Sequence, residues 1–224
     1  LIESLFSGVL FHGLYLGEVF YSISKGMPTA IAALIVTLQP ILTNALSNSI
    51  LGEKVSFNQW LGVFFGFVGA TMVIGLDIGS GIPLSGLIAT IISLIAITSS
   101  TIWQKKLSYN LPLSISNMYQ AIGGFIFHLI IIVLFVDPYI NFTQTFLIAM
   151  SHQIFLVSFG AFTILMFLIK KNSASKTVSI FFLIPPTSAF MAWLFLNEKL
   201  TTIDLVGFLV TSVGVYIATR DSKH

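Results

Sequence analysis

The 224 residues contain no cysteine and little charge. Without cysteine the chain has no disulfide, no thiol nucleophile and no thiolate metal ligand. Charged residues make up 8% of the chain, whereas a soluble domain usually carries about 25%. The formal net charge of +2 does not indicate a nucleic-acid partner. So little charge argues against a soluble globular protein.

Long apolar runs take the place of charge. Hydrophobic residues make up 56% of the chain, and the mean hydropathy is +0.98. A helix needs about 20 mostly apolar residues to cross roughly 30 Å of hydrocarbon. The runs do not alternate and are longer than the about 10-residue strands of membrane barrels, so we predict an all-α integral membrane protein whose partner is the lipid bilayer. Eight transmembrane helices are predicted, at 5–24, 28–51, 57–76, 84–104, 116–136, 146–169, 177–196 and 203–219.

Positive charge is divided unevenly between the two sides that eight spans define. Eight of the ten Lys and Arg residues fall on one side: Lys54, Lys105, Lys106, Lys170, Lys171, Lys176, Arg220 and Lys223. Lys25 and Lys199 fall on the other side. Because cytoplasmic loops carry the excess of Lys and Arg, both ends of this chain are predicted to be cytoplasmic.

One sequence corner occurs twice, 145 positions apart. Leu51-Gly52-Glu53-Lys54 corresponds to Leu196-Asn197-Glu198-Lys199, and Pro40 corresponds to Pro185. The two copies are five spans apart, so they face opposite sides of the membrane. An inverted repeat of this kind is common in secondary transporters. We therefore predict two inverted five-helix repeats, at 1–79 and 80–224, in which the first lacks two of an expected ten helices before Leu1.

The residues around each corner predict local structure. Ser56 with Gln59, and Thr201 with Asp204, have the spacing of helix-capping boxes, so Glu53 and Glu198 are interpreted as structural rather than catalytic. Pro40 and Pro185 are predicted to kink their helices beside a cavity. After each corner, small residues recur at i, i+4 and i+7, which predicts helix-packing faces. These small residues are Gly62, Gly66 and Gly69, and Gly207, Thr211 and Gly214.

Several polar side chains lie within the predicted spans. Apart from Asp204 at the very start of the last predicted span, Glu18 is the only carboxylate among them, and an ionisable group at membrane depth is costly and usually functional. Interhelical hydrogen bonding is the alternative role for each of the other polar residues. We predict that a hydrated substrate pathway includes His12, Tyr15, Glu18, Gln39, Asn44, Gln104, Gln120 and His128.

The chain resembles the EamA-like branch of the drug/metabolite transporter superfamily. The resemblance rests on "HGLYLGEVFYSISKGMP" (12–28), "AALIVTLQPILTNALSNSILGEKVSFNQWLGVFFGFVGA" (32–70), "WQKK" (103–106) and "FFLIPPTSAFMAWLFLNEKLTTIDLVGFLVTSVGV" (181–215). It implies inverted repeats in the inner (plasma) membrane, and export of amino acids or other small metabolites. It also implies a central cavity lined by the first four helices of each repeat, with 57–76 and 203–219 peripheral.

Three functions compete at this stage. The first is a secondary exporter of an unidentified small molecule that works by alternating access, with no cofactor and with homodimer formation left open. The second is a non-transporting remnant of such a transporter. The third is a membrane-embedded enzyme, which is disfavoured because the chain has no HExxH, GxSxG or thiol, and its four histidines lack metal-ligand spacing.

Overall fold

The computed structural model describes residues 1–75, 82–108, 111–135, 138–196 and 201–220, apart from the side chains of 188, 192, 195 and 196. Within these ranges the regular structure is entirely helical, as predicted. The helices are α1 (Ile2–Gly8), α2 (Leu16–Ser24), α3 (Thr29–Val36), α4 (Gln39–Leu51), α5 (Phe57–Ile74), α6 (Leu84–Ser108), α7 (Leu113–Phe135), α8 (Gln144–Ser151), α9 (Phe162–Lys171), α10 (Ala174–Ser179), α11 (Ile184–Leu196) and α12 (Thr202–Thr219). Two π-helical segments, Val9–Tyr15 and His152–Ala161, join α1 to α2 and α8 to α9, and the 3₁₀ turn Ile180–Leu183 joins α10 to α11.

Six helical stretches of the described chain are long and apolar enough to cross a membrane. They are Thr29–Leu51, Phe57–Ile74, Leu84–Ser108, Leu113–Phe135, Gln144–Lys171 and Thr202–Thr219. Each matches one of the predicted spans, and α6 runs further than predicted. It ends beyond Lys105, whose buried Nζ donates to the carbonyl oxygens of Ile169 (3.0 Å) and Asn172 (2.6 Å). These carbonyls lie at the carboxyl end of α9, where a cation is stabilised by the helix dipole.

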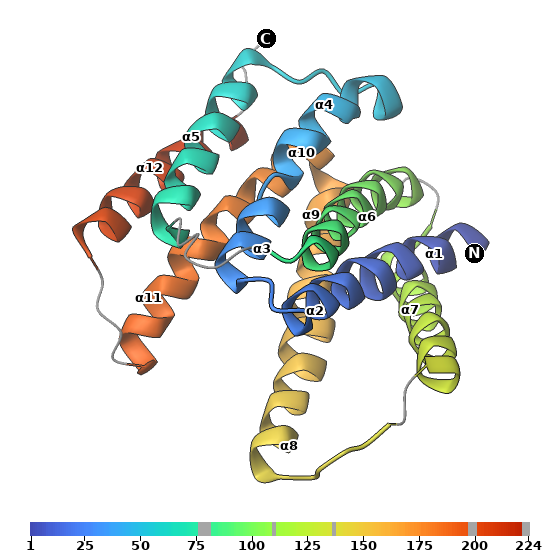
Figure 1. The fold of residues 1–224 in the computed structure, drawn as a ribbon. Coiled ribbons are helices and arrows are strands. Elements are labelled where there is room, and N and C mark those ends of the chain that lie inside the picture. Colours follow the sequence, from blue (N-terminus) through green and yellow to red (C-terminus); the bar gives the residue numbers. More distant parts are fainter. Residues whose placement is uncertain (76–81, 109–110, 136–137, 197–200, 221–224) are drawn as a thin grey trace.

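The helices group around a central pair of broken helices (Figure 1). The first helix (α1 to α2) packs on α6 and α7 at one side, and α5 pairs with α12 at the other. Between these groups lie α3–α4 and α10, and α11 continues from α10 to the lower left of Figure 1, where it packs beside α5 and α12. The corner between α4 and α5 and the carboxyl end of α12 lie at the same end of the bundle, at the top of Figure 1.

The bounds of the helices recur at the 145-residue offset of the sequence corner. Moving α4 by 145 positions gives the bounds of α11, and moving α5 gives those of α12. Likewise α3 and α10 begin 145 positions apart, at Thr29 and Ala174. The two halves of the chain therefore place their helix breaks, before Gln39 and before Ile184, at equivalent positions.

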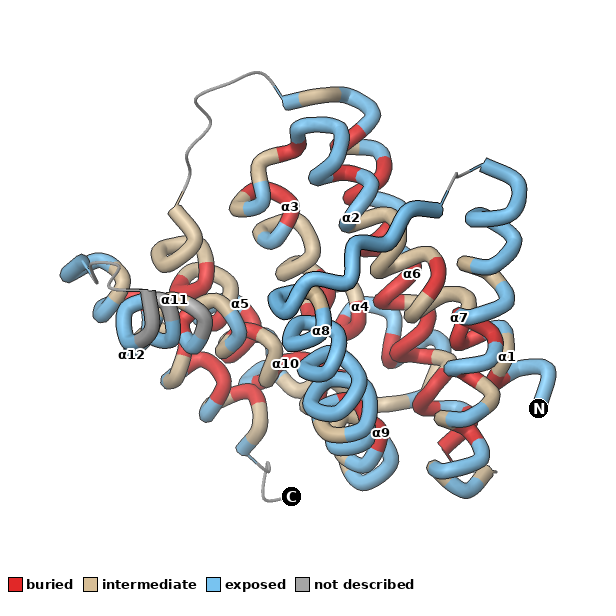
Figure 2. The backbone as a smooth tube through the Cα atoms, turned by 90° about the horizontal axis from the view of Figure 1, so that it is seen from below, coloured by how far each residue is buried: buried red, intermediate tan, exposed pale blue. Residues whose placement is uncertain are grey.

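Burial is reversed relative to a soluble protein. Large apolar side chains cover the outside, and α8 and the π-helical segment after it are exposed almost throughout (Figure 2). The interior is rich in Ser, Thr, Asn and Gln, including fully buried Gln120. Because lipid tails are as apolar as Leu, polar contacts and close packing hold membrane helices together. This distribution fits a chain that lies in contact with the lipid bilayer.

The two small-residue faces pack against each other, which confirms that they are packing faces. A Cβ on Gly214 would lie 2.7 Å from the carbonyl oxygen of Gly62, and one on Gly207 would lie 2.8 Å from that of Gly69. Such contacts leave no room for a side chain, so α5 and α12 approach backbone to backbone. Both predicted capping boxes, at Ser56 and at Thr201, are formed.

Candidate substrate cavity

A cavity of about 760 Å³ lies between the two halves of the chain. Its walls come from the first helix, the α3–α4 break, the end of α5, the middle of α6 and the α10–α11 break. Both Pro40 and Pro185 line it. The end of α5 contributes Val73 and Ile74, so α5 is not wholly peripheral, contrary to what the resemblance implies.

The two helix breaks result from proline chemistry. Proline has no backbone N–H, so Pro40 leaves the carbonyl of Val36 without its helical donor, and Pro185 does the same to Phe181. Val36 and Phe181 both line the cavity. In a membrane, backbone groups released in this way are tolerated where they face a water-filled space. The sequence thus places two irregular segments of backbone where a cavity can hydrate them.

The cavity lining is mainly apolar. Its polar side chains are those of Tyr15, Thr29, Thr37 and Gln39, and none of its described lining residues is charged. Gln39 is held in place because its Nε2 donates a 2.9 Å hydrogen bond to Thr101 Oγ1. A few polar groups set in an apolar wall are typical of small-molecule sites. The described lining thus offers apolar contact area and few polar groups.

The helices that line the cavity close together at one end of it. Most of α4 and all of α10 lie beyond the cavity and pack on each other. Ser175 donates a short hydrogen bond to Asn44 Oδ1, and both oxygens of the Glu53 carboxylate accept from the backbone N–H of Ala174, each at 3.1 Å. We call this the Glu53 end. The lining residues come instead from the whole of α3, from the start of α4 and from the first half of α11.

The closed end contains buried polar atoms that lack partners. Within the described residues, Thr43 Oγ1, Asn44 Nδ2 and Ser47 Oγ have none. All three lie on α4 between the cavity and Glu53. Leaving a buried polar group without a hydrogen bond costs roughly 1–3 kcal/mol, so this segment would be stabilised by water if the end opened.

Of the eight predicted pathway residues, Tyr15 and Gln39 line the cavity. The other six (His12, Glu18, Asn44, Gln104, Gln120 and His128) lie outside its lining. His128 Nε2 lies 2.8 Å from the carbonyl oxygen of His12, so the two histidines join the first helix to α7. Glu18 is only partly buried.

Gln104 and Gln120 belong to a buried hydrogen-bond network between the first helix, α6 and α7. Gln104 Nε2 donates to Gln120 Oε1 (2.9 Å) and to Ser100 Oγ (3.1 Å). Gln120 Nε2 donates to Ser116 Oγ (3.0 Å), and Ser7 Oγ donates to Gln120 Oε1 (3.4 Å). In this conformation both side chains serve helix–helix association.

Two features of the site were missed by sequence reasoning. The first is the partner of Glu53, which is the backbone N–H of Ala174. Because no side chain of Ala174 takes part in the contact, its residue type does not indicate this pairing. The cavity wall is built largely from apolar residues such as Phe181 and Phe182, which cannot be told from core residues in a sequence. Glu198, the counterpart of Glu53, lies outside the described residues. No group of three potential metal-ligating side chains occurs in the described part of the chain.

Membrane-length helices around a cavity that is closed at one end are the architecture of a polytopic membrane transporter. The chain belongs to the EamA-like transporter family, whose model matches residues 1–75 and 84–220. It is 26% identical over 234 residues to the uncharacterized transporter YvbV of Bacillus subtilis (strain 168), covering 100% of this chain and 72% of that protein.

A second relative is also named as a transport protein, and a solved structure has a similar fold. The chain is 22% identical over 209 residues to a probable amino-acid metabolite efflux pump of Salmonella typhimurium (strain LT2), covering 89% of this chain and 70% of the relative. One crystal structure superposes with a TM-score of 0.77 at 16% identity, covering 95% of this chain and 75% of that one. At this identity the superposition establishes the fold alone.

Proposed function

We propose that the protein is a secondary transporter that exports a small metabolite, such as an amino acid with an apolar side chain, by alternating access. The observation that carries this proposal is the cavity between the two halves of the chain, which is lined by both proline breaks and closed at the Glu53 end by the contact between Glu53 and Ala174. The amino-acid class is supported by the name of the Salmonella relative and by the mainly apolar lining.

The proposal includes two inverted repeats, at 1–79 and 80–224. Recurrence of helix bounds at a 145-residue offset supports the repeats. For the copies to face opposite sides, Ile2–Ser24 and 174–196 must cross the membrane together with the six apolar stretches, which makes eight transmembrane helices. In such transporters the substrate site lies between the repeats near the bilayer midplane.

We propose that the Glu53 end lies on the cytoplasmic side of the plasma membrane. Lys54, Lys176 and Arg220 line one cleft at this end. Lys105 donates to the carbonyl oxygens of Ile169 and Asn172, which come just before the cleft residue Ser173 in the sequence. Lys25 caps the carboxyl end of α2, which lies away from the α4–α5 corner in Figure 1. Because positive residues favour the cytoplasmic side, we propose that the closed Glu53 end is cytoplasmic, which would make this conformation outward-facing.

In this mechanism the Glu53 contact is a cytoplasmic closure. While it is formed, the carboxylate at the α4–α5 corner holds the first N–H of α10, and the polar face of α4 stays dry. When it breaks, α4 and α10 separate and the cavity opens to the cytoplasm to load substrate. Interconversion of the two arrangements lets substrate bind on one side of the membrane and leave on the other, and a solute gradient sets the direction of net transport.

Transport of labelled amino acids by the native gene product in proteoliposomes tests the proposal. Ala33 is exposed in the cavity wall, so Ala33→Trp fills the cavity without disturbing packed neighbours. Ala149→Trp, on exposed helix α8, is the matched control. We expect flux in the native protein and the control, and loss of flux in Ala33→Trp. Absence of flux for every amino acid and other small metabolite tried would favour a non-transporting remnant, and lipid turnover without flux would favour an enzyme.

A further inference from the structure

A second cleft, of about 600 Å³, lies at the Glu53 end and shares no lining residue with the substrate cavity. Its side chains include Lys54, Ser56, Asn58, Ser173, Lys176 and Arg220. They come from both halves of the chain, since Lys54 lies at the α4–α5 corner while Lys176 and Arg220 lie on α10 and after α12. We call it the basic cleft.

The basic cleft carries an excess of positive charge. Three cations line it, and its only carboxylate among the described residues is Glu53. Both oxygens of Glu53 already accept from the backbone of Ala174, so that carboxylate is directed at α10. Lys54 and Arg220 are exposed. The amino end of the 18-residue helix α5 also lies in the cleft and adds the positive end of its dipole.

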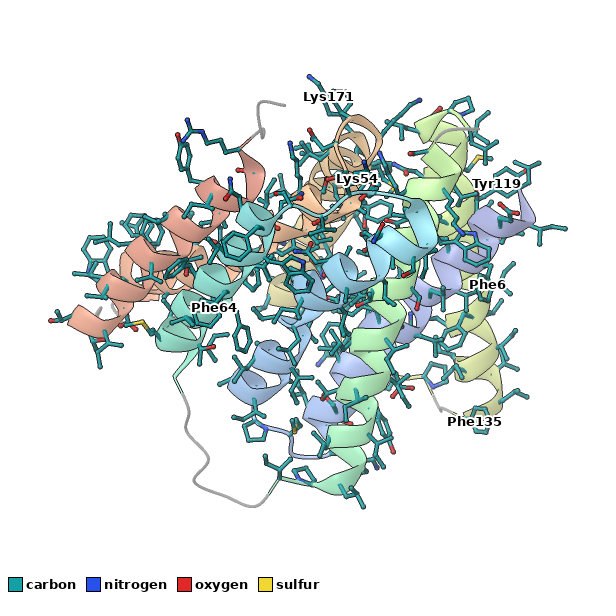
Figure 3. The ribbon with its side chains drawn as sticks, turned by 90° about the horizontal axis from the view of Figure 1, so that it is seen from above. Phe6, Lys54, Phe64, Tyr119, Phe135 and Lys171 are labelled. Carbon is teal, nitrogen blue, oxygen red and sulfur yellow. The ribbon has the colours of Figure 1, made fainter. Side chains whose placement is uncertain are left out.

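The surroundings of the basic cleft place it at the boundary between water and lipid. Phe57, in its wall, is 74% exposed, and Trp60 one turn further on is 40% exposed. Tyr216, over which the Arg220 guanidinium lies at 6.0 Å from the ring centre, is also exposed. Exposed Trp and Tyr are typical of the headgroup region. Below them the outer faces of α5 and α12 are apolar, as Phe64 shows in Figure 3.

We propose that the basic cleft binds a phosphate group, with the headgroup of an anionic membrane lipid as its main source and free phosphate as the other. Lys54 and Arg220 would bind the phosphate oxygens, with Arg able to form a planar pair of hydrogen bonds. The acyl chains would lie along the apolar faces of α5 and α12. Because the cleft draws on both halves of the chain, an occupied cleft stabilises the closed Glu53 end; this last consequence rests on the proposed function.

Affinity measurements on the purified native gene product test the site. Phosphatidylglycerol, phosphatidylcholine and inorganic phosphate are each titrated into the protein in neutral detergent, and binding is followed by tryptophan fluorescence and by the shift in unfolding temperature. We expect saturable binding of phosphatidylglycerol, with no effect of phosphatidylcholine. Inorganic phosphate binding as tightly as the lipid would assign the site to free phosphate.

Variants separate a built site from general attraction. Lys54→Gln and Arg220→Gln should each weaken phosphatidylglycerol binding about fivefold, which corresponds to ~1 kcal/mol per cation near an anionic surface. Lys171→Gln is the matched control, because Lys171 is exposed at the same edge of the bundle but outside the cleft (Figure 3). An equal loss in Lys171→Gln, or no binding of either phosphate compound, would overturn the proposal. Amino-acid flux is measured separately, so its failure leaves this test intact.

Discussion

The contact between Glu53 and the start of α10 gives the sharpest test of how the cavity changes access. Glu53→Gln keeps the size of the side chain and removes its charge. A hydrogen bond to a charged group contributes roughly 1.5–3 kcal/mol, and a neutral one about 0.5–1.5 kcal/mol. Because Glu53 is only partly buried, we take the low end of the difference, ~1 kcal/mol, which shifts the equilibrium toward the open Glu53 end about fivefold. Glu53→Ala removes the bond altogether and should shift it further.

The absence of cysteine from the 224 residues makes the shift measurable. Ser47→Cys places a thiol on the buried face of α4, between the cavity and Glu53, at a position whose hydroxyl has no partner among the described residues. A membrane-impermeant maleimide added from the Glu53 side reacts only when that end is open. We expect the labelling rate to rise about fivefold in Glu53→Gln, in proportion to the open population.

A control thiol distinguishes opening from general loosening. Thr211 is also buried without a partner for its hydroxyl among the described residues, but it lies in the packing face between α5 and α12. Thr211→Cys should therefore stay unlabelled with or without the Glu53 substitution. Equal labelling of the Ser47→Cys protein in the presence and in the absence of the Glu53→Gln substitution would refute the closure role of this carboxylate. Faster labelling of both thiols would mean that the substitution loosens the whole fold.

Three further predictions follow from the packing and the polar network. Gly214→Ala pushes a methyl group into the backbone of α5, so we expect the protein to lose roughly 1–3 kcal/mol of stability and to unfold at a lower temperature. Gly160→Ala, whose added methyl group makes only an ordinary contact, should leave the unfolding temperature unchanged. Gln120→Leu removes the acceptor for two buried donors and should destabilise the protein by about 1–3 kcal/mol, while Gln153→Leu on an exposed surface should not. Glu18→Gln should keep normal flux across an imposed pH gradient, since Glu18 is outside the cavity lining, and a gradient-dependent loss of flux would show instead that Glu18 takes part in proton coupling.

Much of the fold could be predicted because the membrane imposes a strict length and the caps are local. Apolar runs located the helices, and Ser56 with Gln59 marked the start of α5 to the residue. The small residues indicated two helix-packing faces, but the sequence did not predict that the face on α5 packs against the face on α12. That pairing depends on contacts between residues about 145 positions apart.

The candidate site was harder to predict because a polar residue at depth has two equivalent uses. It can face a cavity or pair with another helix, and a rotation of the helix decides which. The first helix contains the π-helical segment Val9–Tyr15, which changes that rotation relative to a regular helix. Tyr15 consequently lines the cavity, while His12, three residues before it, contacts His128.

Equivalent positions in the two halves have opposite surroundings, which is what a single state of an alternating-access cycle requires. Thr29 and Ala174 are 145 residues apart and each begins a broken helix. Ala174 is fully buried and its N–H is held by Glu53, whereas Thr29 is exposed and lines the cavity. Under the proposed cycle their surroundings exchange, so that Thr29 becomes buried as Ala174 becomes exposed, and the buried polar face of α4 gains the water that it lacks while the Glu53 end is closed.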